Sequence, residues 1–351
     1  MSFEMIIFLI IFVVIALLSF LTPLLQSHNI FFGVRIPEKM LERPGLKKLK
    51  RKYIRNFLFL SLIWLVLIGY IIFQHGLKNI EWAVLIWFAI AFIVYIYHNR
   101  QVKQWKSQTL KENPDLKSSN TARIIDTSYR EEKLTIRKGW YVLPIFILIS
   151  QIVLIITQFN RIKSSPDLRS DIIPTLIISF FLFLLIILQN YIINNAKQNI
   201  SARNPKKSKI RNIIFRRRWS IFTFTALTSI ISVFFIINLI HLDIVLWNIQ
   251  FFNRLIVILA FAIVGASFTL SVLMGQSGSR INNGQKDSQT DYDDVDDDQH
   301  WKFGVFYYNP NDPSMFVEKR IGIGWTFNFA NFKSILLGIA LIVVILVLYI
   351  L

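Results

Sequence analysis

The feature of this sequence that most constrains its fold is a series of long apolar runs separated by charged segments. The runs are Met5–Leu25, Phe57–Phe73, Trp82–Tyr97, Trp140–Gln158, Ile172–Ile193, Trp219–Ile240, Phe251–Met274 and Ile335–Leu351. A helix needs roughly 20 apolar residues to cross the hydrocarbon layer of a bilayer. Only 17% of the residues are charged, whereas a soluble domain has about a quarter. We therefore expect an all-α integral membrane protein with about eight transmembrane helices.

The distribution of basic residues predicts the orientation of these helices. Of the 39 lysines and arginines, 34 lie in the loops 26–56, 98–139, 194–218 and 275–334. Positive charge near helix ends stays on the cytoplasmic side, so these loops are expected inside and both termini outside. The excess of Ile, Asn and Lys suggests a bacterial source, and hence the bacterial plasma membrane. The net charge of +18 is thus interpreted as an orientation signal, and no nucleic-acid partner is expected.

The first apolar run is expected to be a span and not a cleaved signal peptide. The segment that precedes it, Met1-Ser2-Phe3-Glu4, contains no Lys or Arg, and no small-x-small cleavage site follows the run.

No pattern in the sequence indicates catalysis, a metal or a cofactor. There is no cysteine, and the five histidines form no H-x-x-x-H pair. Because mid-span carboxylates usually mark ion or proton paths, their lack makes a coupled transporter the second choice. The polar residues inside the apolar runs are expected to hydrogen-bond between helices; they are Ser61, Ser150, Gln151, Ser179, Gln189, Asn190, Ser229, Ser232, Asn238 and Ser267. We therefore expect a non-enzymatic protein without a cofactor.

Two basic segments before predicted spans indicate contact with anionic lipid of the inner leaflet. Leu46, Leu49, Tyr53 and Phe57 recur at helical spacing with basic residues on the other face, which is typical of a helix lying on a membrane surface. Simple anchoring is favoured, with binding of a signalling lipid as the alternative. The expected lipid-contacting residues are Lys47, Lys48, Lys50, Arg51, Lys52, Arg216, Arg217 and Arg218.

The last inner loop divides the chain into four regions. They are a seven-helix membrane region (1–275), a flexible acidic linker (276–300), a small cytoplasmic aromatic module (301–332) and the last transmembrane helix (333–351). The tract Asp291–Asp298 lacks EF-hand spacing. We expect it to be solvated and to face the basic loops, with docking that depends on salt.

Two β-prone runs flank Asn309–Pro313 in the module and predict one small β-hairpin, and Gly322-Ile323-Gly324 is interpreted as a turn. Two interpretations stay open: the module packs under the helix bundle, or it is a docking surface for a ligand or partner protein. The candidate docking residues are Trp301, Tyr307, Asn309, Pro310, Asp312, Pro313, Lys319, Arg320, Gly322, Gly324 and Trp325.

The run Trp301–Asn331, with Asn309-Pro310-Asn311-Asp312-Pro313 and the segment Lys319–Phe329, resembles domain of unknown function 5808 of Gram-positive multi-pass membrane proteins. The segment Phe32–Glu38 is similar to the first inner loop of those proteins. Their relatives include SdpI-like immunity and signalling proteins with an outer Ile-Pro-x-His pattern. This chain has Ile173-Pro174-Thr175-Leu176 instead. The resemblance implies no catalytic residues.

These observations favour a regulator or immunity-type protein that responds to membrane-active compounds. The alternative is a transporter or permease for a small or apolar solute. The sequence does not indicate an oligomeric state.

Overall fold

The computed structural model describes Phe20, Gln26, Ile200 and the ranges 29–76, 80–116, 134–198, 205–281 and 296–350. Most of the first apolar run and residues 291–295 of the acidic tract therefore lie outside the described residues. The longer helices are α2 (Pro44–His75), α3 (Ile80–Glu112), α4 (Val142–Thr157), α5 (Phe159–Ser164), α6 (Pro166–Asn195), α7 (Pro205–His241), α8 (Ile249–Met274) and α9 (Phe332–Ile350).

Six helices of the described chain are long and apolar enough to cross a membrane, namely α2, α3, α4, α6, α7 and α8. This confirms the mostly helical, membrane-type architecture. Helix α9 coincides with the last apolar run, and its part Phe332–Val347 is apolar but shorter than the six candidate spans. The count of eight spans therefore stays a prediction.

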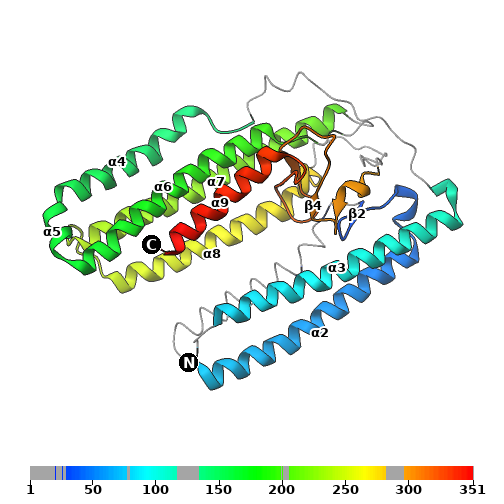
Figure 1. The fold of residues 1–351 in the computed structure, drawn as a ribbon, viewed down its shortest axis with the longest axis horizontal. Helices are drawn as coiled ribbons and strands as arrows, with labels where there is room; N and C mark the ends of the chain where they lie inside the picture. Colours follow the sequence, from blue (N-terminus) through cyan, green and yellow to red (C-terminus); the bar gives the residue numbers. More distant parts are fainter. Residues whose placement is uncertain are drawn as a thin grey trace.

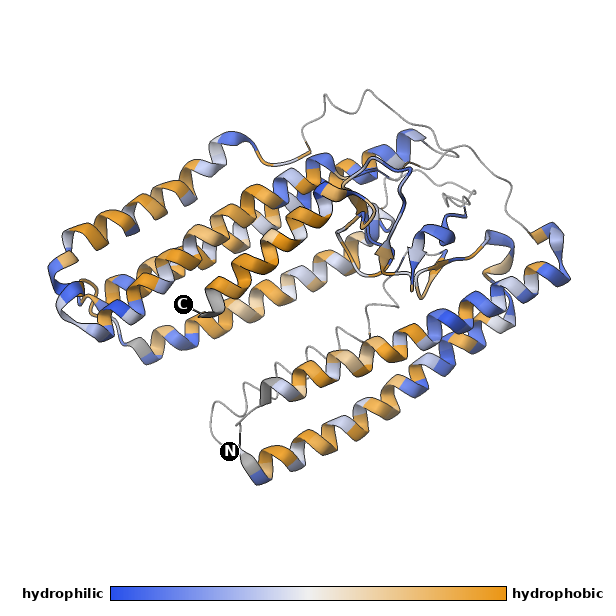
Figure 2. Cartoon of the chain, in the orientation of Figure 1, coloured by the Kyte–Doolittle hydropathy of each residue, from blue (hydrophilic) through white to orange (hydrophobic). Residues whose placement is uncertain are grey.

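The helices begin earlier, or end later, than the apolar runs inside them. Helix α2 begins at Pro44, where proline fits because the first helical N–H needs no partner. It ends at Gly76, whose positive φ of 65° and N–H bond to the Ile72 carbonyl close the last turn. Figure 2 shows the result: apolar stretches along the helices with polar extensions at their ends.

The helices fall into two groups (Figure 1). The helix pair consists of α2 and α3, which pack on each other, and the helix bundle consists of α4, α6, α7 and α8. Polar side chains link the bundle, because Gln151 donates to the Ser179 hydroxyl and Thr175 donates to Asn238 at 2.8 Å. This confirms the hydrogen bonding between helices expected for Gln151, Ser179 and Asn238. The expectation is wrong for four serines, which donate to a carbonyl of their own helix: Ser61, Ser150, Ser229 and Ser232.

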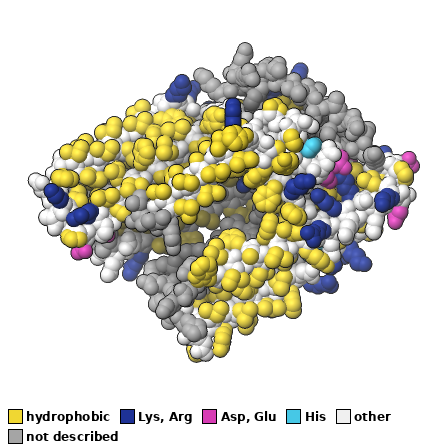
Figure 3. Space-filling model, in the orientation of Figure 1, with side chains coloured by type: hydrophobic (Ala, Val, Ile, Leu, Met, Phe, Trp, Pro, Cys, Tyr) yellow, Lys and Arg dark blue, Asp and Glu magenta, His cyan; other side chains and the backbone are white. Residues whose placement is uncertain are grey.

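Many apolar side chains of both groups face outward. Along the apolar 18-residue stretch of α8, no residue is buried inside the protein. Figure 3 shows hydrophobic side chains over the flanks of both groups, with Lys and Arg gathered mainly toward the ends. Such a surface is compatible with contact to lipid, because bilayer tails are as apolar as the side chains.

Within the described residues, the strands form three antiparallel pairs. They are β1 (Ile30–Phe31) with β2 (Val34–Arg35), β3 (Trp301–Lys302) with β4 (Phe306–Tyr307), and β5 (Phe316–Glu318) with β6 (Trp325–Phe327). A single hairpin across Asn309–Pro313 was expected, and that expectation is wrong. Positive φ at Gly304 (71°) and at Gly322 (70°) turns each β-prone run back onto its own neighbour. The interpretation of residues 322–324 as a turn is confirmed.

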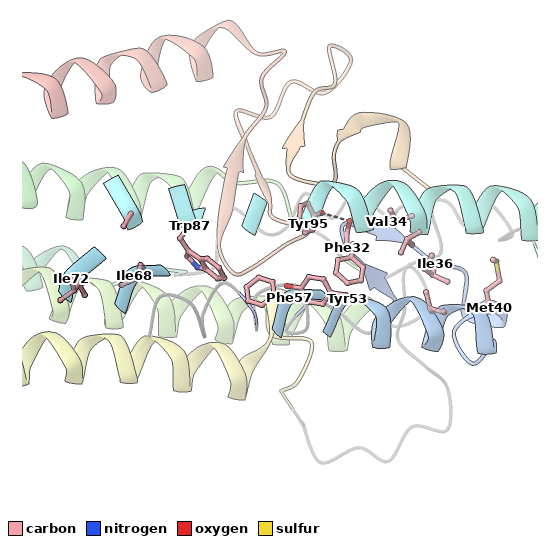
Figure 4. Packing of buried hydrophobic residues seen from close by; sticks show 13 residues of the cluster. Phe32, Val34, Ile36, Met40, Tyr53, Phe57, Ile68, Ile72, Trp87 and Tyr95 are labelled. Atoms are coloured by element: carbon pink, nitrogen blue, oxygen red, sulfur yellow. Dashed lines mark hydrogen bonds between the residues drawn. The ribbon is translucent and has the colours of Figure 1, made fainter. Parts of the chain in front are cut away.

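The largest apolar cluster joins the β1–β2 hairpin to the helix pair (Figure 4). Phe32 lies edge-on to Tyr53 of α2, with 4.8 Å between ring centroids, and Phe57 packs on Trp87 of α3 at 5.5 Å. The apolar face of the amphipathic segment, expected against the inner leaflet, is thus covered by protein. Leu46, Tyr53 and Phe57 are all buried, while the lysines beside them are largely exposed.

Candidate functional site

The candidate site is the C-terminal module (301–332) together with the described end of the acidic tract (296–300), where the two contact both helix groups. The buried Asn328 organises its interior: its Nδ2 donates to the carbonyls of Asn309 (3.0 Å) and Asp312 (2.9 Å). The Tyr307 hydroxyl donates to the Asp312 carboxylate at 2.8 Å. The Asn-Pro-Asn-Asp-Pro segment is therefore held as a rigid turn.

Glu318 attaches the module to the helix bundle. Its side chain is buried and accepts hydrogen bonds from Asn212 Nδ2 (2.6 Å), from Arg216 Nη2 (3.3 Å) and from the Ser277 hydroxyl. Asn212 and Arg216 belong to α7, and Ser277 follows α8. One carboxylate thus joins three parts of the chain, and its partners compensate the loss of water around the charge.

Arg216 extends this attachment to the end of α6. Its guanidinium donates to the carbonyls of Ile193, Ala196 and Lys197, where α6 ends and leaves carbonyls without helical partners. It also lies 5.7 Å from the centroid of the Trp325 ring. The sequence places Arg216 among the lipid-contacting cations, but its side chain is fully buried inside the protein. Its neighbours Arg217 and Arg218 are exposed.

Two further contacts hold the module on the bundle. The Gln276 side chain pairs with the backbone of Gly324, with both hydrogen bonds at 3.0 Å. Lys197 Nζ lies 2.6 Å from the Asp312 carboxylate. Burial raises the pKa of Asp312, but hydrogen bonds led by that of Lys197 outweigh it and hold the pKa below its usual value. The carboxylate is therefore charged at neutral pH.

Arg320 attaches the module to the helix pair indirectly, through the β1–β2 hairpin and the end of the acidic tract, which both contact those helices. Its side chain is buried, donates to the Gly33 carbonyl at 2.7 Å, and forms ion pairs with Asp297 and Asp298. Lys106 of α3 lies 2.7 Å from the carboxylates of both Asp296 and Asp298. The described end of the acidic tract thus faces basic residues, as expected. The expectation that it is solvated is wrong for Asp297 and Asp298, whose side chains are only 17% and 16% exposed because they pack against these cations.

Asp298 is the most highly connected carboxylate of this junction. It accepts from the Arg35 backbone N–H at 3.1 Å as well as from Arg320 and Lys106. Burial by itself raises the pKa of Asp298, but the charges of Arg320 and Lys106 and the hydrogen bonds outweigh it and hold the pKa below its usual value. Asp298 therefore stays ionised, and the attachment stays intact, at neutral and mildly acidic pH.

Two glycines from opposite ends of the chain meet beside Arg320. Gly33 (φ 73°) and Gly304 (φ 71°) each follow a phenylalanine that also has positive φ, and so form tight turns. A Cβ atom on Gly33 would lie 2.6 Å from the Gly304 Cα. The Tyr95 hydroxyl lies 2.7 Å from the Phe32 carbonyl and 3.0 Å from the Phe303 carbonyl, and so connects both turns. We call this contact the glycine clasp.

Sequence reasoning missed the glycine clasp and the partners of Arg320. The signal that could have indicated it is the tripeptide Phe-Gly-Val, which occurs at residues 32–34 and again at 303–305. Tyr95 and Asn99, which hold Phe32, lie at the end of an apolar run and gave no signal of their own.

The candidate docking residues separate into an inner and an outer set. Trp301, Tyr307, Asp312 and Arg320 are buried, and the last two bind other parts of this chain. Pro310, Pro313 and Lys319 are exposed, whereas Asn309, Gly322, Gly324 and Trp325 are partly buried. The geometry thus favours the interpretation in which the module packs under the helix bundle.

The charged groups of the site hold segments of this chain together. Its carboxylates face Lys and Arg side chains. Within the described residues, no group of three or more His, Asp or Glu side chains could hold a metal ion.

A family of unknown function, DUF5808, has a model that matches residues 310–335. The match covers a small part of the chain and supports the resemblance of the C-terminal module, including Glu318 and Arg320. Searches of the curated proteins and of the solved structures found no match. The likeness to SdpI-like proteins has no support from these comparisons.

The close contact in the glycine clasp predicts that one added methyl group lowers the stability of the protein strongly. Gly33→Ala places its Cβ against the Gly304 backbone and forces alanine into a positive φ, so it should destabilise the protein by about 2 kcal/mol or more. Thermal unfolding of the detergent-purified protein measures this. Gly338→Ala is the control, because its Cβ would meet no atom within 4 Å. Equal midpoints for the two variants would contradict the clasp.

The buried pair of Arg216 and Glu318 predicts a non-additive double mutant. Arg216→Met leaves Glu318 buried without its cation and should lower the free energy of unfolding by about 3–5 kcal/mol. The double variant Arg216→Met/Glu318→Met should recover much of this lost stability, because no unpaired charge then remains buried. The exposed neighbour provides the matched control: Arg217→Met should change stability by less than about 0.5 kcal/mol. A thermal midpoint for Arg216→Met that equals that of Arg217→Met would show that the pair does not hold the module.

Proposed function

We propose that this chain is a non-enzymatic regulator or immunity-type protein of the bacterial plasma membrane that responds to membrane-active compounds. The observation that supports it best is the position of the C-terminal module, which joins the helix pair through Arg320 and the helix bundle through Glu318. Any movement of one helix group relative to the other must therefore disturb the contacts that the module makes with both.

The mechanism follows from how the two groups are held. Among the described helices, the extensive contacts lie within each group, α2 with α3 and α6 with α7 and α4. A compound that enters the bilayer changes the lateral packing around the exposed apolar flanks. A shift of one group against the other pulls on ion pairs that are costly to break when buried. The module then leaves one group and uncovers surface for a partner.

The membrane placement in this proposal has eight spans, both termini outside, and the basic loops and module in the cytoplasm. Its support is the six candidate spans, the apolar helix α9, and the concentration of Lys and Arg in alternate loops. Lys47, Lys48, Lys50 and Arg51 are exposed at the start of α2. In this placement they meet the anionic inner leaflet.

Cysteine labelling tests the placement, because the chain contains no cysteine of its own. Lys111 in the last turn of α3 and Gln250 in the first turn of α8 are exposed. The proposal places these two helix ends on opposite sides of the membrane. A membrane-impermeant maleimide should label Gln250→Cys in intact cells and Lys111→Cys only after the cells are opened. Equal labelling of both variants in intact cells would refute the orientation.

Survival under challenge tests the regulatory role. Expression in a susceptible bacterium should change survival against a panel of membrane-active peptides and detergents. Arg320→Gln should abolish the change at equal protein level, because it detaches the module from the helix pair. Lys319→Gln, one residue away and exposed, should leave it intact.

Two results would count against this role: unchanged survival across the panel, or identical behaviour of the Arg320→Gln and Lys319→Gln variants. Uptake of the challenging compound, measured in the same cells, separates a regulator from the permease alternative.

A further inference from the structure

Helices α4 and α7 enclose an open groove of about 650 Å³. Its walls include Gly139 and Trp140 just before α4 and Phe146 on α4. The facing wall includes Phe224, Thr228 and Ser232 on α7. The volume is within the range of about 300–1,000 Å³ typical of small-molecule sites. The lining is mostly apolar, so a ligand with a hydrocarbon portion fits it best.

The hydroxyl groups along this wall of α7 are already hydrogen-bonded within the helix, with one exception, so they do not make the wall polar. Thr225, Ser229 and Ser232 each donate to a carbonyl of their own helix four residues earlier, at 2.8 to 2.9 Å. Thr228 is 5% exposed, and its hydroxyl has no hydrogen-bond partner among the described residues. A buried hydroxyl without a partner costs free energy, and a ligand with an oxygen acceptor would remove that cost.

Cationic side chains stand at one end of the groove. Lys138 immediately precedes Gly139, and Arg217 lies seven residues before Phe224, which is two turns along the same face of α7. Both side chains are exposed. The segment 134–157 and helix α7 contain no Asp or Glu. The charge at this end therefore favours an anion.

The two helices run in the same direction and in matching register here. The Ile136 N–H donates to the Ser220 hydroxyl at 3.1 Å, and one turn later the Trp140 and Phe224 rings meet at 5.6 Å. Lys138 and Arg217 thus lie toward the same end of the two helices. An anionic group at this end would continue directly into the apolar groove.

We propose that this groove binds one anionic phospholipid, with an acyl chain along Trp140 and Phe224 and the phosphate between Lys138 and Arg217. A cationic membrane-active peptide would meet like charges at the entrance and is disfavoured. The proposal rests on the membrane placement proposed above, since it puts the basic end of the groove at the level of the inner-leaflet headgroups.

Native mass spectrometry of the purified full chain tests the site, with phosphatidylglycerol and phosphatidylcholine as the two probes. The wild type should retain one phosphatidylglycerol. The double variant Lys138→Gln/Arg217→Gln should weaken retention by about thirtyfold, because two basic groups are lost and each contributes about 1 kcal/mol near anionic lipid. Ser229→Phe should weaken it as well, because the ring fills the groove while both charges remain.

The matched control removes two exposed charges that belong to no proposed lipid contact, in Lys163→Gln/Arg254→Gln, and should retain phosphatidylglycerol like the wild type. Equal retention of both lipids, an unchanged double variant, or equal loss in the control would each overturn the groove as an anionic lipid site. The thermal midpoint of each variant shows that it is folded. Failure of this site would leave the cysteine labelling pattern as predicted, so the two proposals fail separately.

Discussion

A buried guanidinium must be surrounded by acceptors, and this requirement determines where the C-terminal module can lie. Arg216 and Arg320 are both almost completely buried. Arg216 uses the carbonyls at the end of α6 together with Glu318, and Arg320 uses Asp297, Asp298 and the Gly33 carbonyl. If the module moved away, one partner of each pair would remain buried and uncompensated, at a cost of several kcal/mol. The module is therefore held in one position by two separate penalties.

The two attachments use side chains of opposite charge and lead to different helix groups. Glu318 is an anion that enters a cationic site on the helix bundle, and Arg320 is a cation that enters an anionic site beside the helix pair. Only Lys319 separates them in the sequence, so one short segment carries both connections. This arrangement makes the segment sensitive to the spacing of the two helix groups, which is the physical basis of the regulatory proposal.

The membrane helices follow a different rule from the module. Their outward faces are apolar and are compatible with contact to lipid, which would replace a protein partner there. Their inward contacts include polar pairs such as Gln151 with Ser179 and Thr175 with Asn238. A groove such as that between α4 and α7 can then persist, because lipid can fill it where a soluble protein would have to collapse or admit water.

The sequence by itself determined the membrane class, six helices of the described chain, the turn at Gly322–Gly324 and the packing face of Leu46, Tyr53 and Phe57. These features depend on composition and on spacing within one segment. The length of an apolar run decides whether it can cross a bilayer, and the spacing of apolar residues decides which face of a helix packs. Only the tertiary structure decided the pairing of the strands, the burial of Arg216 and the glycine clasp. Gly33 and Gly304 lie far apart in the chain, and Arg216 looks like Arg217 and Arg218 in a basic run. Which of these residues becomes buried depends on acceptors that other segments supply, and no pattern within the segment itself carries that information.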